Sequence, residues 1–260
     1  MKKILFLGEK EIGEKAFDLL LDGHGKFYTI NVVVSNKSPD VWWESNNIYM
    51  ASLDRFLFIP NDKKREKEII RAIKKHSIDL IISVQHPWIL SRSVLQSVDY
   101  QTLNLHNAKL PEYKGNNAVN HAILNGDSTY TSTVHWMTEK VDSGEIAIEE
   151  TFKLDSEITA KELYNCAISA GLKAFQKLIN YLKEGDEIPK KPMKGISRYY
   201  SRDSIGKLRR IENINDPIEV DRKSRAFFFP PFEPAFYEND KKKVYILAQK
   251  FLELDSNFRI

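Results

Sequence analysis

The sequence is poor in cysteine, in excess charge of either sign and in long apolar runs. Its single cysteine, Cys166, excludes an internal disulfide and any zinc site built from several cysteines. Its 39 basic and 36 acidic residues leave a formal net charge of +3, which lacks the basic surplus typical of nucleic-acid-binding proteins. No apolar run approaches the roughly 20 residues of a membrane-spanning helix, and charge returns at Glu9, too early for a signal peptide. We therefore expect a cytoplasmic protein that binds neither nucleic acid nor membrane.

Two common ligand-binding motifs are also absent. The segment GEKEIG, from Gly8 to Gly13, follows the first predicted strand but is not the G-x-G-x-x-G of dinucleotide-binding proteins. Its acidic side chains fall where a pyrophosphate would lie, so Gly8 is better explained by a tight turn. No metal-ligand spacing relates the four central histidines, His86, His106, His121 and His135. We therefore predict neither a nicotinamide cofactor nor a bound metal.

The first half of the chain alternates strand-like and helix-like segments. This alternation predicts right-handed β-α-β units and a mostly parallel sheet. A short helix and a pair of strands are expected after it. The predicted strands are residues 3–7, 28–35, 79–84, 101–106, 132–137 and 144–154, and the predicted helices are 11–21, 65–76 and 116–124.

The longest helix is predicted from Thr159 to about Lys183. Thr159 and Glu162 match a capping box at its start, and Gly185 is a suitable stop at its end. Its apolar residues recur at helical spacing and include the lone cysteine, which we assign to core packing. This apolar stripe is Leu163, Cys166, Ala167, Ala170, Ala174, Leu178 and Leu182.

Near residue 190 the chain becomes basic and aromatic, which indicates a boundary. We predict an α/β fold class, with a Rossmann-like, mostly parallel sheet flanked by helices over residues 1–189. Residues 190–260 are expected to form a small C-terminal α+β annex. It should contain a helix at 217–228 and a β-hairpin at 234–247 that turns at Asn239 and Asp240.

Asn104 and His106 form a polar pair at the end of a buried strand. Because they are two residues apart, their side chains face the same side of the sheet. Burying such a pair is costly unless something uses it. Ligands of parallel sheets bind at the carboxyl ends of the strands, where His106 would project. An isolated histidine is more often structural, so the surrounding residues decide between the alternatives.

Those residues resemble the folate-dependent formyltransferase family, which includes methionyl-tRNA, glycinamide-ribonucleotide and nucleotide-sugar formyltransferases. The family carries Asn-x-His followed by Leu-Pro-x-x-x-Gly, matched by Asn104, His106, Leu110, Pro111 and Gly115. It then carries an aspartate in a turn before a strand, matched by Asp142 within residues 141–146, and residues 89–95 are similar to its folate-side loop and helix. The resemblance covers about residues 1–185 and is specific because several motifs occur in order.

The resemblance implies transfer of a formyl group from N10-formyltetrahydrofolate to an amine, by direct attack through a tetrahedral intermediate. Asn104 would donate a hydrogen bond to the oxyanion, and His106 would act as general base. Asp142 would orient His106 and favour its charged form, or place a water that relays the proton. The co-substrate is expected to contact Gln85, His86, Pro87, Ile89, Leu90, Glu139, Lys140 and Val141.

The resemblance extends to the acceptor. Residues 225–235 are similar to the aromatic-proline stretch of nucleotide-sugar N-formyltransferases, where aromatic rings can stack on a base or a hexose. The alternative is that these phenylalanines form a small satellite core. Lys10, Arg198 and Arg202 are candidates for a diphosphate. The expected substrate is an amino-deoxyhexose nucleotide such as dTDP-4-amino-4,6-dideoxyglucose, used for lipopolysaccharide O-antigen. Its expected contacts are Gly8, Lys10, Lys109, Tyr113, Tyr199, Tyr200, Phe229 and Phe232.

Several alternatives stay open. A homodimer through the C-terminal region is expected on the resemblance alone, and Trp42 and Trp43 line either the substrate cleft or a dimer contact. A methionyl-tRNA formyltransferase normally has an additional β-barrel domain and a basic face, which argues against that substrate. A non-catalytic nucleotide-sugar-binding module and a hydrolase that releases formate from the folate are the other two possibilities.

Overall fold

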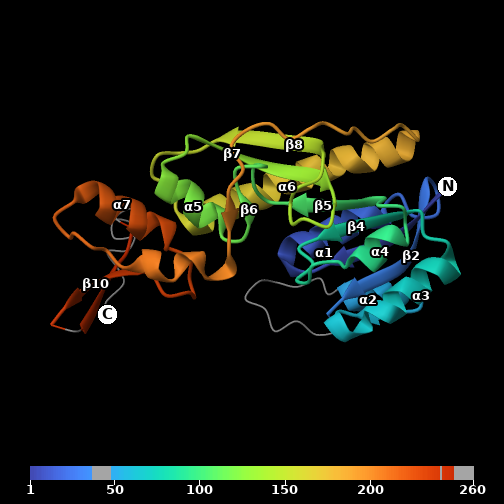
Figure 1. Cartoon of the computed structure of the whole chain (residues 1–260), viewed down its shortest axis with the longest axis horizontal. Coiled ribbons are helices and arrows are strands. Elements are labelled where there is room, and N and C mark those ends of the chain that lie inside the picture. The colour runs from blue at the N-terminus through green and yellow to red at the C-terminus, as the bar shows by residue number, and fades with distance from the viewer. Residues whose placement is uncertain (37–47, 241, 249–260) are drawn as a thin grey trace.

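A twisted seven-stranded sheet forms the centre of the computed structural model, which describes residues 1–36, 48–240 and 242–248 (Figure 1). The strand order is β3-β2-β1-β4-β5-β7-β8. Neighbours from β3 to β5 pair in parallel, whereas β5, β7 and β8 pair in antiparallel fashion. The predicted α/β fold class with a mostly parallel sheet is therefore confirmed. Trp42 and Trp43 lie outside the described residues.

The elements predicted for the first part of the chain are all present. They are β1 (Lys2–Gly8), α1 (Lys10–Leu21), β2 (Tyr28–Ser35), α3 (Glu66–His76), β4 (Leu80–Val84), β5 (Thr102–His106), α5 (Ala118–Asn125), β7 (Thr129–Trp136) and β8 (Ile146–Lys153). The periodicity did not predict four short elements. These are α2 (Ile48–Ser52), β3 (Leu57–Pro60), and the two-residue strands β6 (Lys114–Gly115) and β9 (Tyr199–Tyr200). A further short helix, α4 (Arg92–Gln96), lies in the segment for which only the resemblance indicated a helix.

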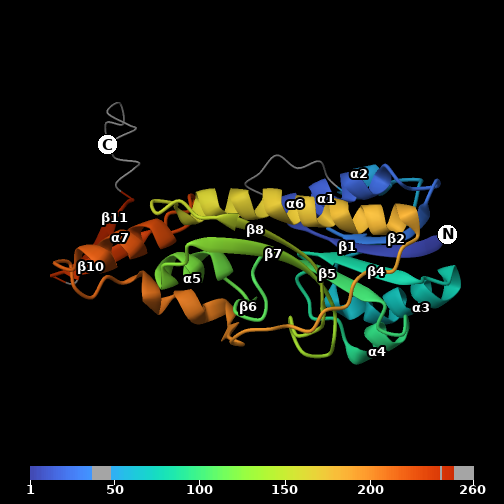
Figure 2. The same ribbon diagram turned by 90° about the horizontal axis from the view of Figure 1, so that it is seen from above.

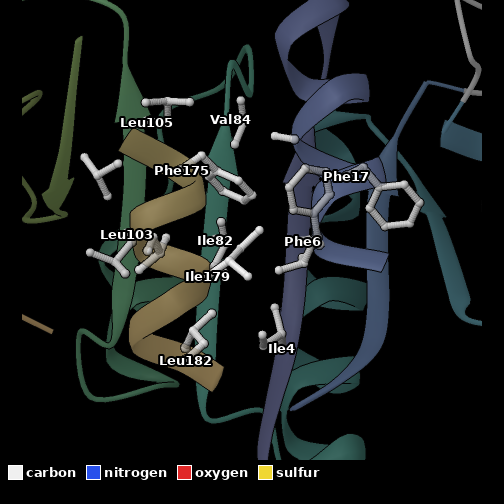
Figure 3. Close-up of a cluster of buried hydrophobic side chains, with 14 of the residues drawn as sticks. Ile4, Phe6, Phe17, Ile82, Val84, Leu103, Leu105, Phe175, Ile179 and Leu182 are labelled. Carbon is white, nitrogen blue, oxygen red and sulfur yellow. The ribbon is translucent and has the colours of Figure 1, made fainter. Parts of the chain in front are cut away.

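Helices cover both faces of the sheet, which explains the continuous apolar runs of its central strands. α1 and α6 (Ala160–Glu184) lie on one face, and α3 and α4 lie on the other (Figure 2). Ile4 and Phe6 of β1 belong to the core cluster on the first face, which Figure 3 shows with Phe17 of α1 and side chains of α6. Leu5 belongs to the cluster on the second face. All of these side chains are removed from water, which stabilises the fold by roughly 1.5–3 kcal/mol for each.

The long helix α6 begins and ends as predicted. Thr159 and Glu162 form the capping box, and Gly185 has the left-handed φ of 76° that ends the helix. The assignment of Cys166 to the core was wrong, because its side chain is exposed. Successive residues turn by about 100°, and the buried arc runs through Leu163, Ala167 and residues C-terminal to them, so position 166 falls just outside it.

The annex contains the predicted helix, α7 (Pro217–Ala226), and the predicted hairpin of β10 (Ala235–Asn239) and β11 (Lys242–Ile246). It lies at the end of the molecule beyond α5 (Figure 1). Phe227 is buried in a cluster that includes Ala122 of α5 and Leu163 of α6. The annex and the sheet-bearing part of the chain therefore share a core. Among the described residues, no helix combines the length and apolarity needed to cross a membrane.

Candidate active site

Two neighbouring cavities open at the carboxyl ends of β1, β4 and β5. The larger measures about 480 Å³ and the smaller about 290 Å³, and both are lined by Gln85, His106, Gly115 and Asn116. Lys10 follows β1 and Gln85 follows β4. Both have left-handed backbone, with φ of 60° and 57°, and Lys10 Nζ donates a hydrogen bond of 3.1 Å to Gln85 Oε1. Non-glycine residues keep this conformation only where the surrounding structure holds them in it, which is frequent at functional sites.

The three residues singled out by the sequence come together at the smaller cavity. Asn104 and His106 project from β5, and Asp142 lies in the turn between β7 and β8. The His106 Nδ1 atom is 3.7 Å from Asp142 Oδ2. The Asn104 carboxamide reaches His135 of β7, with 3.2 Å between Nδ2 and the ring Nε2. The prediction that Asn104 and His106 share one side of the strand therefore agrees with the site geometry.

The hydrogen bonds of His106 define what its ring can do. Its Nε2 lies 2.7 Å from the carbonyl oxygen of Tyr113. A carbonyl only accepts, so Nε2 carries the hydrogen and Nδ1 is the proton-accepting atom of the neutral ring. After protonation, Nδ1 would carry a hydrogen on the side of Asp142. The neutral ring can therefore act as a base, and the charged ring is stabilised by a carboxylate.

Asp142 is held as a carboxylate at one corner of the site. Burial acts to raise the pKa of Asp142, but the neighbouring rings of His106 and His135 and a hydrogen bond from the Gly115 backbone lower it below its ordinary value. The Gly115 N–H donates to Asp142 Oδ2 at 2.8 Å, and His135 Nε2 lies 3.5 Å from Oδ1. The backbone φ of Asp142 is 45°, which places this side chain in a tight left-handed turn. The carboxylate therefore remains ionised near neutral pH.

Replacing Asp142 with asparagine should remove a pH-dependent part of the stability. Because the folded-state pKa of Asp142 is depressed, the stability that its carboxylate contributes is present above the unfolded pKa, near ~3.9, and is lost as the pH falls through the folded value. The free energy of unfolding should therefore differ between wild type and Asp142→Asn at pH 7, and the difference should shrink below pH ~4. Urea unfolding at several pH values measures this. A difference that is constant over that range would contradict the assignment.

His135 is a member of the site that the sequence analysis considered only as a metal ligand. It is 1% exposed, and its strand register puts it opposite Asn104. Its Nδ1 lies 2.9 Å from the Trp136 carbonyl and therefore carries a hydrogen, so in the neutral ring Nε2 accepts from the Asn104 amide. The available signal was a histidine within a predicted strand, but register with β5 could not be read from the sequence.

The C-terminal annex is hydrogen-bonded to the loop that holds the triad. β6 pairs with β9, so Gly115 lies opposite Tyr200. The same glycine donates its N–H to Asp142, and Tyr113, two residues earlier, supplies the carbonyl partner of His106. The annex therefore supports the hydrogen-bonded partners of both His106 and Asp142.

Replacing Gly115 with alanine should disturb this link. The backbone φ of Gly115 is 91°, and an added Cβ would lie 2.2 Å from the Tyr200 carbonyl oxygen. We expect a loss of about 1–3 kcal/mol in the free energy of unfolding together with reduced turnover, because the contact to Asp142 must shift. Gly25→Ala is the matched control, since Gly25 also has a left-handed φ of 77° but nothing lies within 4 Å of an added Cβ. Equal effects of the two substitutions on turnover would contradict this expectation.

The smaller cavity contains most of the residues predicted for the co-substrate. Glu139 does not line it; its carboxylate instead pairs with Arg92 at 3.2 Å and accepts from the Tyr100 hydroxyl at 2.8 Å. The His86 Nδ1 atom is buried without a hydrogen-bond partner among the described residues. Burial lowers the pKa of His86 to about 4, so its ring is neutral near pH 7. The predicted residues that do line the cavity are Gln85, His86, Pro87, Ile89, Leu90, Lys140 and Val141.

The larger cavity contains a smaller share of the residues predicted for the acceptor. Lys10, Phe229 and Phe232 line it, and Phe229 also packs against the annex cluster. A contact of this ring with a base or a hexose stays a prediction. Tyr199 lines the smaller cavity, as does Arg202. Residues that sequence reasoning did not select also line the larger cavity: Asn107, Asn116, Tyr164, Arg209 and Glu233.

The remaining predicted contacts lie elsewhere. Lys109, Tyr113 and Arg198 line a separate cavity of about 360 Å³. Tyr113 is buried, and its hydroxyl donates to Asp127 at 2.5 Å; burial, followed by this bond, raises the pKa of Tyr113. Tyr200 stacks on His121 with ring centroids 3.8 Å apart, which gives it a packing role. Gly8 is buried beneath Phe6.

A metal centre finds no support in the described part of the chain. No group of three or more histidine, cysteine, aspartate or glutamate side chains has the arrangement needed to hold a metal ion there. His106, His135 and Asp142 instead satisfy one another and nearby backbone atoms.

Comparison with known proteins agrees with this geometry. Residues 2–185 match the family described as formyl transferase. GDP-perosamine N-formyltransferase of Brucella melitensis is 31% identical over 172 residues, or 65% of this chain and 64% of that protein. The chain thus covers less than two thirds of that relative's length. Methionyl-tRNA formyltransferase of Clostridium tetani is 30% identical over 247 residues, or 94% of this chain and 79% of that protein.

The fold is likewise found in solved structures. An N-formyltransferase from Helicobacter canadensis, solved with folinic acid and dTDP-3-aminofucose, superposes with a TM-score of 0.74. The superposition covers 94% of this chain and 86% of that one at 23% identity. Because the family match spans the residues from β1 to α6, including Asn104, His106 and Asp142, the chain belongs to the formyl transferase family.

Proposed function

We propose that this chain is an N-formyltransferase that transfers a formyl group from N10-formyltetrahydrofolate to the amine of a nucleotide-linked amino-deoxyhexose, for example dTDP-4-amino-4,6-dideoxyglucose. The observation that carries the proposal is the position of His106, which lies in the wall shared by two cavities. Transfer between two molecules requires both to meet at one set of catalytic groups. One cavity then receives the formyl donor and the other receives the acceptor.

Asn104, His106 and Asp142 supply the groups that amine formylation needs. Negative charge develops on the formyl oxygen, and the Asn104 carboxamide donates a hydrogen bond at any pH. The attacking amine must lose a proton, which His106 accepts at Nδ1. Asp142 then stabilises the charged ring across 3.7 Å, while the Tyr113 carbonyl keeps the ring oriented through Nε2.

The smaller cavity suits the formyl donor. N10-formyltetrahydrofolate supplies an activated formyl group when bound. The unpartnered, neutral His86 ring offers a hydrogen-bonding atom to a polar heterocycle, and the exposed side chains of Trp88 and Ile89 offer apolar surface. Residues 85–90, Lys140 and Val141 would hold it.

The larger cavity suits an elongated acceptor with an aromatic end. Tyr164, Phe229 and Phe232 also line this cavity, and their rings can stack on a base. Lys10 and Arg209 add positive charge, which favours a diphosphate. The Brucella protein is named for GDP-perosamine, and the Helicobacter structure is described as a complex with dTDP-3-aminofucose. Both descriptions support a nucleotide-linked amino sugar as the substrate class, and the assay below decides which nucleotide base it carries.

We extend the proposal to a cytoplasmic homodimer that modifies a sugar destined for O-antigen, with a catalytic domain at residues 1–189 and an annex at 190–260. The end of the family match at residue 185 supports that boundary. Sedimentation velocity tests the dimer: a single species near the 30.2 kDa of the chain would contradict it.

The test is a formylation assay with N10-formyltetrahydrofolate and a panel of dTDP-, GDP- and UDP-linked sugars that bear a 3-amino or 4-amino group. We expect turnover of at least one sugar, with one formyl group transferred per sugar as measured by mass spectrometry. Binding of the folate without formylation of any sugar would reject the acceptor, and absence of folate binding would reject the whole proposal.

A second candidate is formylation of methionyl-tRNA, favoured by the similarity to the Clostridium protein over 94% of the chain. The net charge of +3 gives little electrostatic attraction for tRNA. The same assay with charged initiator tRNA distinguishes the two, because formyl-methionyl-tRNA would be the product only of the second.

A further inference from the structure

Asn107 is a polar residue of the larger cavity to which the catalytic roles above assign nothing. It follows His106 directly, at the end of β5, and it lines the cavity together with that histidine. Its Oδ1 atom is buried and has no hydrogen-bond partner among the described residues. Native proteins satisfy nearly all buried polar atoms, so an unpartnered amide oxygen on a residue of this cavity wall calls for a partner that arrives from outside.

The long helix α6 has a glycine at the point where it packs against the Asn107 side chain. Gly171 lies within its 25 residues, where a glycine costs about 1 kcal/mol relative to alanine. A Cβ added at Gly171 would lie 2.5 Å from Asn107 Oδ1 and 3.6 Å from its Cγ. The glycine therefore makes room for the carboxamide, which occupies the space that a side chain of the helix would otherwise fill.

The backbone of Asn107 is fixed as well. Its carbonyl accepts a hydrogen bond of 2.7 Å from the hydroxyl of Tyr130, which is itself 1% exposed. Because the main chain of Asn107 is anchored and its side chain packs against Gly171, the carboxamide can adopt few orientations. A polar group presented in this way has little conformational entropy to lose when it binds a ligand.

The environment indicates what Asn107 would bind. Asn107 lies in a cavity wall that combines apolar side chains, such as Ala118 and Val119, with further carboxamides, such as Asn116 and Asn120. It offers both a donor and an acceptor, which matches a hydroxyl or an amine better than a phosphate. Asn107 adjoins His106, where the reacting amine must lie, so the group that it meets belongs to the same sugar ring.

We propose that Asn107 is a specificity-determining residue that hydrogen-bonds the sugar ring beside the reacting amine and so selects which amine position faces His106. This inference rests on the proposed function. Asn107 touches the sugar without taking part in proton transfer, so its loss affects binding and selectivity more than the chemical step.

The experiment compares wild type with Asn107→Leu, a variant of similar volume, on 3-amino and 4-amino nucleotide sugars. We expect the KM for the preferred sugar to rise about 3- to 10-fold and the preference between the two amine positions to narrow, the size expected from one neutral hydrogen bond. The KM for N10-formyltetrahydrofolate should not change. Thermal stability should not fall, because the substitution removes an unpartnered buried oxygen; a purely structural Asn107 would lower the Tm instead.

Gly171→Ala gives a second, independent measurement. The added Cβ would lie 2.5 Å from Asn107 Oδ1 and 2.9 Å from Ile12 Cδ1. We expect the nearer contact to shift the Asn107 carboxamide, so the KM and the preference should change in the same direction as in Asn107→Leu. Ser169→Ala, at an exposed position of the same helix, is the matched control. Wild-type activity with unchanged KM and preference in Asn107→Leu overturns this inference alone. Absence of wild-type activity on every sugar overturns the proposed function, and the inference falls with it.

Discussion

His106→Ala is expected to lower kcat by about 10²–10⁴-fold, the range for loss of a positioned general base. Among the described residues, the His106 ring lines both cavities and has a proton-accepting atom, Nδ1, that faces a carboxylate. Solvent water replaces it poorly, because water lacks both the basicity and the orientation that the Tyr113 carbonyl imposes. The KM for the sugar should change little. Steady-state formylation at saturating folate measures both values.

The control for this substitution is His76→Ala. His76 is the last residue of α3 and lines neither cavity, so its replacement should leave kcat and the folate KM at the wild-type values. A pH profile adds a second readout. The acidic limb of the kcat profile should disappear in His106→Ala, because the titrating base is gone. Retention of that limb, or a fall in kcat below threefold, would show that another group accepts the proton.

Local patterns were sufficient to predict most of the fold. Ile4, Leu5 and Phe6 are all buried and pack alternately on the two faces of the sheet, as a strand covered on both faces requires. The capping box at Thr159 predicted where α6 begins. These signals depend on neighbours along the chain. Cys166 was misplaced because a position at the margin of a helical stripe is decided by the neighbouring sheet and helices.

Pairings between distant segments could not be predicted in the same way. β3 has four residues and includes Pro60, too few for a recognisable period, and β6 finds its partner β9 more than eighty residues later. The hydrogen bond from Gly115 to Asp142 depends on that second pairing being formed nearby. A two-residue strand has no signal of its own, so only the folded chain reveals it.

The residues of the candidate site also fall into those that local sequence predicts and those that depend on contacts between distant segments. Asn104 and His106 were recognisable together because a spacing of two on a strand is local information. Asp142 entered through the resemblance, since nothing within residues 141–146 indicates that they approach β5. Three other residues could not be recognised from a short stretch of sequence. His135 is placed by its register with β5, Asn107 packs beside Gly171 of α6, and Arg209 comes from the annex.

Asn104→Ala is expected to lower kcat by about 10²–10³-fold, the usual consequence of removing one donor from a developing oxyanion. The Asn104 amide is held by His135 Nε2 at 3.2 Å, so its orientation is set before the substrate binds. Such preorganisation is what makes a single amide effective, because no reorganisation is needed as charge develops. The KM values should stay within a few-fold, since the donor acts mainly in the transition state.

A double-mutant cycle then separates the role of Asn104 from that of His135. If His135 acts only by holding the Asn104 amide, His135→Ala should lower kcat when Asn104 is present and have little further effect in the Asn104→Ala background. Asn104→Asp provides a stricter test, because it keeps the shape of the side chain but places negative charge where the oxyanion develops. Its kcat should fall at least as far as that of Asn104→Ala. Near-normal turnover in Asn104→Asp would show that the oxyanion is stabilised by another group. Additive losses of kcat in the double-mutant cycle would show that His135 has a role of its own toward Asp142, which lies 3.5 Å from it.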